Sequence, residues 1–165
     1  MLLWRWLGRA AYWLAWPALF VYLRIGARTR VLVVAEDQIL LVQSWMGDAK
    51  WALPGGGLHR GERPQDGAVR EVAEETGVLL DAKQIQLLNS GWYSSQGLAS
   101  YCHFFAARVD RPMQPRHQRG EILAARWFSL ADIAHIPTKP NVGHALKLLA
   151  LHRSSVVNKQ SIDNQ

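Results

Sequence analysis

The chain has 165 residues, enough for one domain with a sizeable core and short extensions, and too few for two enzymatic domains. Its composition, 49% hydrophobic and 19% charged, excludes a disordered chain, and its single cysteine, Cys102, excludes an intrachain disulfide or a cysteine-based zinc cluster. The formal net charge of +6 favours anionic partners, whether phosphorylated small molecules, nucleic acid or a membrane surface.

Residues 1–25 differ from the rest and are predicted to form a separate Trp-rich hydrophobic helix. Residues 2–23 hold half of the eight tryptophans, and residues 10–23 carry no charge. As a helix this uncharged run would reach only about 21 Å, short of the roughly 30 Å hydrocarbon core of a bilayer. Three alternatives stay open: a helix lying at a membrane interface, a helix spanning the membrane, and a helix packed on the domain or on a second subunit, as in a homodimer.

A cleaved signal peptide is a further alternative for this first segment. It is disfavoured because Arg24 follows the apolar run directly and no small-residue cleavage site is visible. Tryptophan and tyrosine near the ends of the run, with flanking arginines, suit a membrane interface. We therefore expect a cytoplasmic protein that is peripheral at the inner face of a membrane.

Residues 26–153 are expected to form one folded domain that begins with a strand hairpin. Arg30–Ala35 and Ile39–Gln43 are β-branched and aliphatic runs separated by three polar residues. Trp51–Leu53 reads as a strand that stops at the glycine run 55–57, where the backbone can take positive φ angles.

The rest of the domain alternates helical and extended patterns. Pro64–Thr76 is predicted to be a helix, since its apolar residues recur at helical spacing, proline suits its first position and Gly77 suits its end. Further elements are expected as strands at Ile85–Leu88, Leu98–Val109 and Ile122–Phe128, a short helix from Ser129 through Ile133, and a last helix at Asn141–His152. Residues 154–165 read as a loose polar tail. This order argues for a layered α/β domain.

Three acids on the predicted central helix are candidate metal ligands. Glu71, Glu74 and Glu75 stand at i, i+3 and i+4, so their side chains converge on one side of the helix. Their mutual repulsion would be cancelled by a divalent cation, and hard oxygen ligands favour Mg²⁺ or Mn²⁺ over zinc. Taken alone, such a triplet is more often a solvated acidic face.

The surrounding sequence changes that balance. The stretch from Gly56 reads GGLHRGERPQDGAVREVAEETGV. It fills every fixed position of the Nudix box, a glycine, five residues, a glutamate, seven residues and then R-E-U-x-E-E-x-G-U, at Gly56, Glu62, Arg70, Glu71, Val72, Glu74, Glu75, Gly77 and Val78. The chain thus resembles the Nudix hydrolase family over roughly residues 28–150, and not over the Trp-rich start or the tail.

The resemblance implies an α/β/α sandwich with a mixed sheet, here preceded by the N-terminal hydrophobic helix, and a site for one or more divalent ions. It implies that Glu74 and Glu75 are metal ligands, that Glu71 is a ligand or the general base, and that the carbonyl of Gly55 is a further ligand. It also implies a structural ion pair between Arg70 and Glu62.

Residues outside the box would complete catalysis and substrate binding. Glu121 is a second candidate for the base, and an ordinary strand-edge glutamate is an equal alternative. Trp92 and Tyr93 could stack on a base, and a phosphate could be met by one of four arginines, Arg108, Arg111, Arg116 or Arg119. Core or surface roles are the competing interpretation for each.

The function predicted from the sequence is metal-dependent hydrolysis of a phosphoanhydride bond. The substrate would be a nucleoside diphosphate linked to another group, or a nucleoside triphosphate. Two alternatives remain: a Nudix module that senses nucleotides without turnover, and a pyrophosphohydrolase that acts on the 5′ end of RNA. No box glutamate is missing, which disfavours the first, and no RNA motif is present, which disfavours the second.

Overall fold

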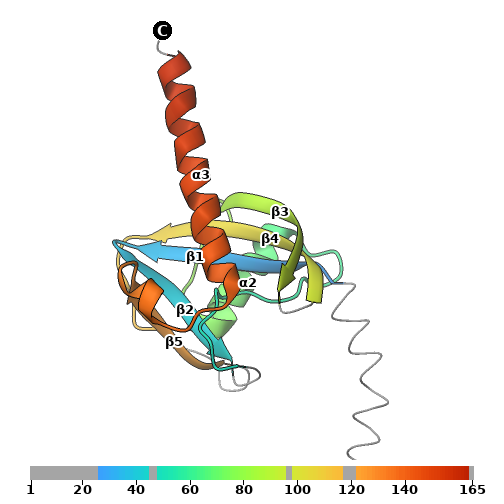
Figure 1. Ribbon diagram of the computed structural model, residues 1–165. Coiled ribbons are helices and arrows are strands. Elements are labelled where there is room, and N and C mark those ends of the chain that lie inside the picture. The colour runs from blue at the N-terminus through green and yellow to red at the C-terminus, as the bar shows by residue number, and fades with distance from the viewer. Residues whose placement is uncertain (1–25, 45–47, 96–97, 117–121, 164–165) are drawn as a thin grey trace, which may run out of the picture.

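The protein is described by a computed structural model that covers residues 26–44, 48–95, 98–116 and 122–163. Five strands form one sheet in the order β3-β4-β1-β2-β5 (Figure 1). Their bounds are Arg28–Ala35 for β1, Gln38–Ser44 for β2, Gln86–Ser95 for β3, Leu98–Val109 for β4 and Ile122–Ser129 for β5. The predicted helix N-terminal to the sheet lies outside the described residues.

The sheet is mixed, as predicted. β1 and β2 form the expected antiparallel hairpin, and β2–β5 and β3–β4 are also antiparallel. β1 and β4 run parallel along the whole of β1, from the pair Arg28–Cys102 to the pair Ala35–Val109. Two parallel strands need a long connection between them. The helix at Pro64–Thr76 lies within the connection from β1 to β4.

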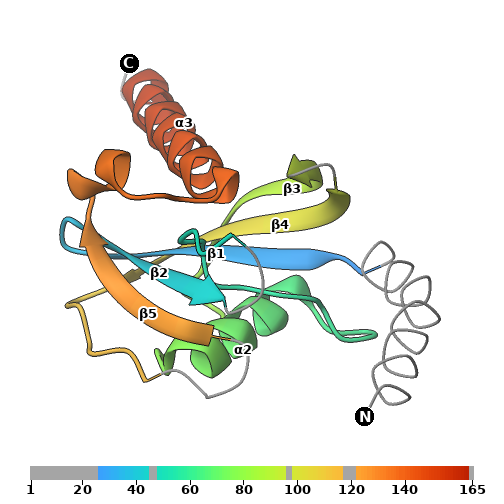
Figure 2. The same cartoon turned by 60° about the horizontal axis from the view of Figure 1, so that its bottom comes forward.

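Two helices cover opposite faces of the sheet and make the α/β/α sandwich that the sequence predicts. α2 (Pro64–Thr76) lies on one face and α3 (Pro140–Asp163) on the other (Figure 2). Alternation along β1 divides the core, because Val31 and Val33 pack in the cluster under α2 while Leu32 and Val34 pack in the cluster under α3. Each face of the sheet therefore has its own hydrophobic core, one under α2 and one under α3.

The glycine run lies directly beside the start of β1. The N–H of Thr29 donates to the carbonyl of Gly56 at 2.9 Å, and the N–H of Val31 donates to the carbonyl of Pro54 at 3.0 Å. β1 and β2 pair only near their hairpin turn, which leaves room for this segment. A bend far along the chain is thereby fixed to the central strand.

Several boundaries differ from the prediction. Residues 51–53 do not continue as a strand, because Ala52 bridges Val42 while Trp51 bridges Thr138 on another segment. The short helix predicted from Ser129 through Ile133 begins later and is a 3₁₀ helix, Asp132–His135. Ser129 ends β5 instead, and its hydroxyl accepts a hydrogen bond from the N–H of Ala131.

The last helix is also longer than predicted. Residues 154–163, expected as a loose tail, continue α3 to Asp163. No glycine or proline interrupts these residues, and Ser154 donates its hydroxyl to the carbonyl of Ala150 at 3.1 Å, as helical serines do. In Figure 1 the end of α3 projects beyond the sheet.

Among the described residues, no helix combines the length and the apolar character needed to cross a bilayer. The predicted membrane-associated segment is not among these residues, so its interpretation stays a prediction.

Candidate functional site

Helix α2 supplies most of the candidate site, and its ends are set by the sequence. Pro64 occupies its first turn, where its missing N–H costs no hydrogen bond. Gly77 ends it with a φ of 72°, and its N–H returns to the carbonyl of Ala73 at 2.8 Å. Ala68, Val72 and Thr76 form the buried stripe. The acids between these positions consequently face away from the core.

Arg70 is the centre of the polar network on the exposed side of α2. Its Nε and Nη2 atoms donate to the two carboxylate oxygens of Glu62 at 2.8 and 3.0 Å. Nη1 donates to Glu71 at 2.8 Å and to Glu74 at 3.2 Å, and Nη2 also donates to the carbonyl of Gly57 at 3.0 Å. A guanidinium has five N–H groups, so this network uses all of its donors.

The Arg70–Glu62 ion pair joins the glycine-rich loop to the helix. The guanidinium hydrogen bonds lower the pKa of Glu62 to about 2, with a further contribution from the N–H of His59, which donates at 2.8 Å. The same pair raises the pKa of Arg70 above its ordinary value. With side chains only 14% and 22% exposed, the two groups are ionised at any physiological pH.

Glu71 lies against the glycine bend. Its side chain is 14% exposed. A Cβ added to Gly56 would lie 2.5 to 2.7 Å from the carboxylate atoms of Glu71, closer than carbon atoms can pack. Gly56 therefore leaves the space that this carboxylate occupies, and a side chain at position 56 would displace the carboxylate from it.

Glu75 contacts the same bend one residue earlier. Its Oε2 accepts a hydrogen bond from the N–H of Gly55 at 2.8 Å. Gly55 has a φ of 134° and would place a Cβ 2.3 Å from the carbonyl oxygen of Thr29, so both its backbone angles and its surroundings demand glycine. The carbonyl of Gly55 in turn accepts from the guanidinium of Arg30.

The donor set fits a hard divalent cation. Glu71 and Glu75 contact the bend at Gly56 and Gly55, and Glu74 lies on the same helix between them. Oxygen ligands of this kind, together with the carbonyl of Gly55, are those that Mg²⁺ and Mn²⁺ prefer. Among the described residues no three acidic, histidine or cysteine side chains are gathered around a single point, because Arg70 holds Glu71 and Glu74 while Gly55 holds Glu75. Glu74, with 49% of its side chain exposed, has the most freedom to turn.

Trp92 and Tyr93 point to opposite faces of β3, so they cannot stack on one base together. Tyr93 packs under α3, with ring centroids 5.2 Å from Phe104 and 5.0 Å from His144. Trp92 is 73% exposed and lies 6.0 Å from Tyr101, edge to face. Trp92 therefore remains the more accessible of the two candidates.

Arg116 lies at the end of α2. Its N–H donates to the carbonyl of Thr76 at 2.8 Å, and its backbone packs against Gly77. The side chain is exposed. The loop that follows β4 is also held by Trp127, whose indole N–H donates to the carbonyl of Met113 at 2.7 Å. The candidates Arg119 and Glu121 lie outside the described residues.

Two further side chains, one at the glycine bend and one on β4, were not predicted from the sequence. Arg30 reaches the carbonyl of Gly55 across 25 positions of sequence, and a basic residue at the start of a strand gives no sign of such a contact. His103, whose Nδ1 is 2.7 Å from the hydroxyl of Ser90, continues the line of rings from Trp92 through Tyr101, and partial burial lowers its pKa. Alternating aromatic residues on β4 were the one available signal for it.

Comparison with known proteins places these features in a family. The family model described as NUDIX domain matches residues 25–149. A Caenorhabditis elegans protein named putative nudix hydrolase 1 is 34% identical over 111 residues, which cover 66% of this chain and 27% of the relative. The chain spans between about a quarter and two fifths of the length of the first curated relatives that it matches.

Solved structures share the fold. The NUDIX domain of Shewanella oneidensis NrtR, determined in complex with ADP ribose, matches with a TM-score of 0.65 and 21% identity, over 79% of this chain and 87% of that one. A Caenorhabditis elegans Ap4A hydrolase in a binary complex matches with a TM-score of 0.63 and 18% identity, over 79% of this chain and 99% of that one. At these identities the likeness concerns the fold alone.

Proposed function

This chain belongs to the Nudix family, and we propose that it hydrolyses a phosphoanhydride bond in a nucleotide-derived substrate with the help of Mg²⁺ or Mn²⁺. The substrate is a nucleoside diphosphate linked to a second group, or a nucleoside triphosphate. The names of the fold neighbours, an ADP-ribose complex and an Ap4A hydrolase, support a nucleotide-derived ligand of this kind.

One observation carries the proposal. Two glutamates one helical turn apart meet two consecutive glycines: Glu71 occupies the space that a side chain at Gly56 would fill, and Glu75 accepts the N–H of Gly55. Partial burial of two acids against a bend costs hydration and contributes nothing to apolar packing. It is useful where carboxylates must stand close to a cation and to an anionic substrate.

In this proposal Glu74, Glu75 and the carbonyl of Gly55 hold the metal, with Glu71 as a further ligand or as the general base. The bound ion supplies charge that screens the phosphate oxygens and lowers the pKa of a water molecule. Arg70 restrains Glu71 and Glu74 from one side. These hydrogen bonds restrict the rotamers of the two side chains, so less conformational entropy is lost when the carboxylates bind the ion.

Arg70 and Glu62 are positioning residues in this account. Their paired hydrogen bonds fix the loop of residues 57–62 to α2, and a bidentate pair of this kind gives a defined orientation as well as energy. The glycine bend and the helix then keep a constant separation while the carboxylates reorient.

Either Glu71 or Glu121 takes the proton from the attacking water. Glu71 is favoured by its fixed place beside the bend, while Glu121 stays the rival on sequence grounds. For the substrate, exposed Trp92 offers a ring face to a base, and exposed Arg116 at the end of α2 offers a guanidinium to a phosphate. Tyr93 and Arg119 stay predictions from the sequence.

A substrate panel tests the proposal. The purified protein is incubated with ADP-ribose, diadenosine tetraphosphate and a nucleoside triphosphate, each with Mg²⁺, Mn²⁺ or a chelator, and the products are identified by phosphorus NMR. We expect cleavage between two phosphorus atoms of at least one substrate, dependent on the metal. Equal rates with metal and with chelator, or no turnover of any phosphoanhydride, would contradict it.

A further inference from the structure

A second charged opening lies at the other end of the sheet, on the face that α3 covers. Two adjoining cavities of about 230 and 240 Å³ share four lining residues, Val34 of β1, Arg108 of β4, and Leu149 and Arg153 of α3. Each is slightly smaller than the roughly 300–1,000 Å³ usual for small-ligand sites. Because they share these walls, they form two compartments of one opening.

This opening is separate from the glycine bend. Val34 pairs in register with Arg108, and it lies four residues along β1 from Arg30, which contacts the bend. Four residues of a strand extend over roughly 13 Å. The lining residues Val34, Leu146 and Leu149 belong to the core cluster under α3, whereas α2 lies on the opposite face.

The walls combine positive charge with an apolar floor. Arg108 and Arg153 line both compartments from different elements, and neither makes an ion pair with another residue in the described part of the chain. Glu36 is the single acid among the described lining residues. Two guanidinium groups and one carboxylate on its described walls leave the opening with a net positive charge, which a bound anion would offset.

The rim adds neutral hydrogen-bonding groups. Gln86 of β3 and His152 of α3 meet with their side-chain nitrogens 2.5 Å apart, and Gln84 lines the same compartment. The floor is apolar, formed by Val34, Ala106 and Leu149. Guanidinium groups bind phosphate through two parallel hydrogen bonds, and an apolar floor suits the non-ionic body of a phosphate ester.

We infer that this opening, the distal cavity, binds a phosphate-bearing small molecule between Arg108 and Arg153, independently of the metal and of the box glutamates. Nucleoside monophosphate and inorganic phosphate share the required chemistry. Such a site would let the protein hold a phosphorylated ligand that it does not cleave.

The test uses the full chain with a chelator present, so that metal-dependent binding at α2 is suppressed. Adenosine monophosphate, inorganic phosphate and adenosine are titrated in turn, and the backbone amide signals of residues 106–108 and 149–153 are followed by NMR. We expect saturable shifts with the monophosphate and none with adenosine. If inorganic phosphate binds as tightly as the ester, free phosphate is the ligand; if the ester binds more tightly, the cavity takes phosphate esters.

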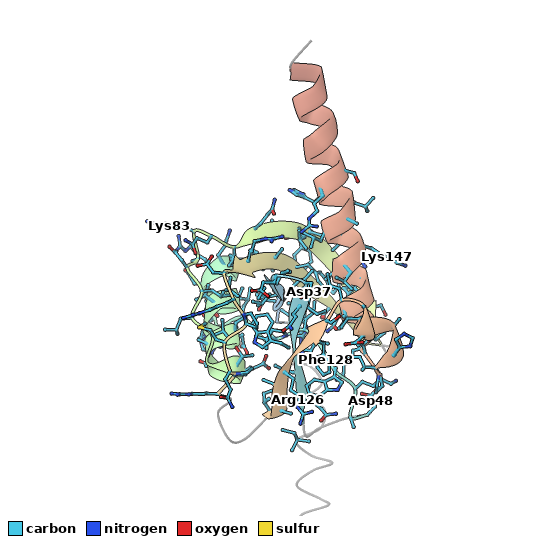
Figure 3. The ribbon with its side chains drawn as sticks, turned by 90° about the vertical axis from the view of Figure 1, so that its left-hand side faces the viewer. Asp37, Asp48, Lys83, Arg126, Phe128 and Lys147 are labelled. Atoms are coloured by element: carbon cyan, nitrogen blue, oxygen red, sulfur yellow. The ribbon has the colours of Figure 1, made fainter. Side chains whose placement is uncertain are left out.

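Matched variants assign the binding to the two arginines. The double variant Arg108→Gln/Arg153→Gln should bind at least roughly tenfold more weakly. The control Arg126→Gln/Lys147→Gln also removes two positive charges, one from β5 and one from α3, and neither residue lines the cavity. Figure 3 shows Lys147 projecting from α3 and Arg126 on β5. This control, and Glu75→Gln, should bind as the parent does.

Three results would overturn the inference: no saturable shift of the cavity amides with either phosphate ligand, binding of adenosine as tight as that of its monophosphate, or equal weakening in the control. Circular dichroism verifies that the variants fold. The single variant Arg153→Gln, at an exposed helical position, provides the same comparison if the double variant does not fold.

Discussion

The carboxylate of Glu75 accepts a 2.8 Å hydrogen bond from the backbone N–H of Gly55, twenty positions earlier in the chain. The helix that carries the acids and the bend that faces them are therefore joined by a direct contact. Arg30 binds the carbonyl of the same glycine from β1. Strand β1, the glycine bend and helix α2 are consequently joined by hydrogen bonds. We expect a substitution that moves one of them to shift the positions of the other two.

Replacing Glu75 by glutamine should abolish metal-dependent hydrolysis and leave the fold intact. The amide oxygen of the new side chain can still accept from Gly55, but it carries no charge to bind a cation, so we expect a loss of more than roughly 100-fold in kcat/KM. Phosphate release measures the activity and circular dichroism the fold. A variant as active as the parent would remove Glu75 from the metal site.

Two neighbouring glycines offer a matched comparison. In Gly56→Ala the new methyl group would meet the carboxylate of Glu71, which can swing away at small cost in stability but loses its place in the site. Gly57→Ala meets nothing within 4 Å. We therefore expect Gly56→Ala to lose activity while its free energy of unfolding changes by less than about 1 kcal/mol.

Gly57→Ala is the control and should retain both activity and stability. Enzyme assays measure the activity of the two variants, and urea unfolding measures their stability. If both alanine variants kept full activity, the placing of Glu71 against the bend would have no functional importance.

The Glu62–Arg70 pair predicts a dependence of stability on pH. The pKa of Glu62 is lowered from 4.5 to about 2 in the folded protein, so its ionised form stabilises the fold above pH 4.5. That contribution, on the order of 2–3 kcal/mol, is lost as the pH falls from about 4.5 towards 2. Urea unfolding of the parent and of Glu62→Gln from pH 7 to pH 3 should show a stability difference that shrinks with acidification. A constant difference would exclude this linkage.

Replacement by lysine should lower the free energy of unfolding at Arg70 but not at Arg63. Arg70→Lys replaces five directed donors by one ammonium group, which cannot serve Glu62, Glu71 and the carbonyl of Gly57 together. We expect the free energy of unfolding to fall by about 1–3 kcal/mol. Arg63 pairs with Asp66 at the exposed start of α2, so Arg63→Lys should change stability very little. Equal effects in urea unfolding would refute the special role of the Arg70 network.

Patterns that are local in sequence were predicted well. Helix α2 begins at Pro64 and ends before Gly77 as its proline, its glycine and its spacing of apolar residues indicate, and the bounds of β4 were predicted correctly. The end of α3 was not, because Ser154 and the residues after it lack an apolar pattern but also lack any helix-breaking residue.

Contacts between distant segments could not be predicted. The spacing of the box placed Glu71 and Glu75 on one side of a helix, but it could not show that they meet Gly56 and Gly55 there, or that Arg30 approaches the same bend. The opposite orientations of Trp92 and Tyr93 follow from strand alternation, which applies only once β3 is known to continue through both. Arg108 was a candidate for phosphate binding on sequence grounds, but no pattern in β4 or α3 indicates that it lines one opening together with Arg153.

The binding of a divalent ion by the acids of α2 is the claim on which the proposed activity depends. Calorimetric titration of Mn²⁺ into the full chain, with a non-hydrolysable nucleoside triphosphate analogue present, tests it most directly. We predict saturable uptake by the parent and its loss in the double variant Glu74→Gln/Glu75→Gln. Absence of uptake by the folded parent, or uptake by the double variant equal to that of the parent, would contradict the account.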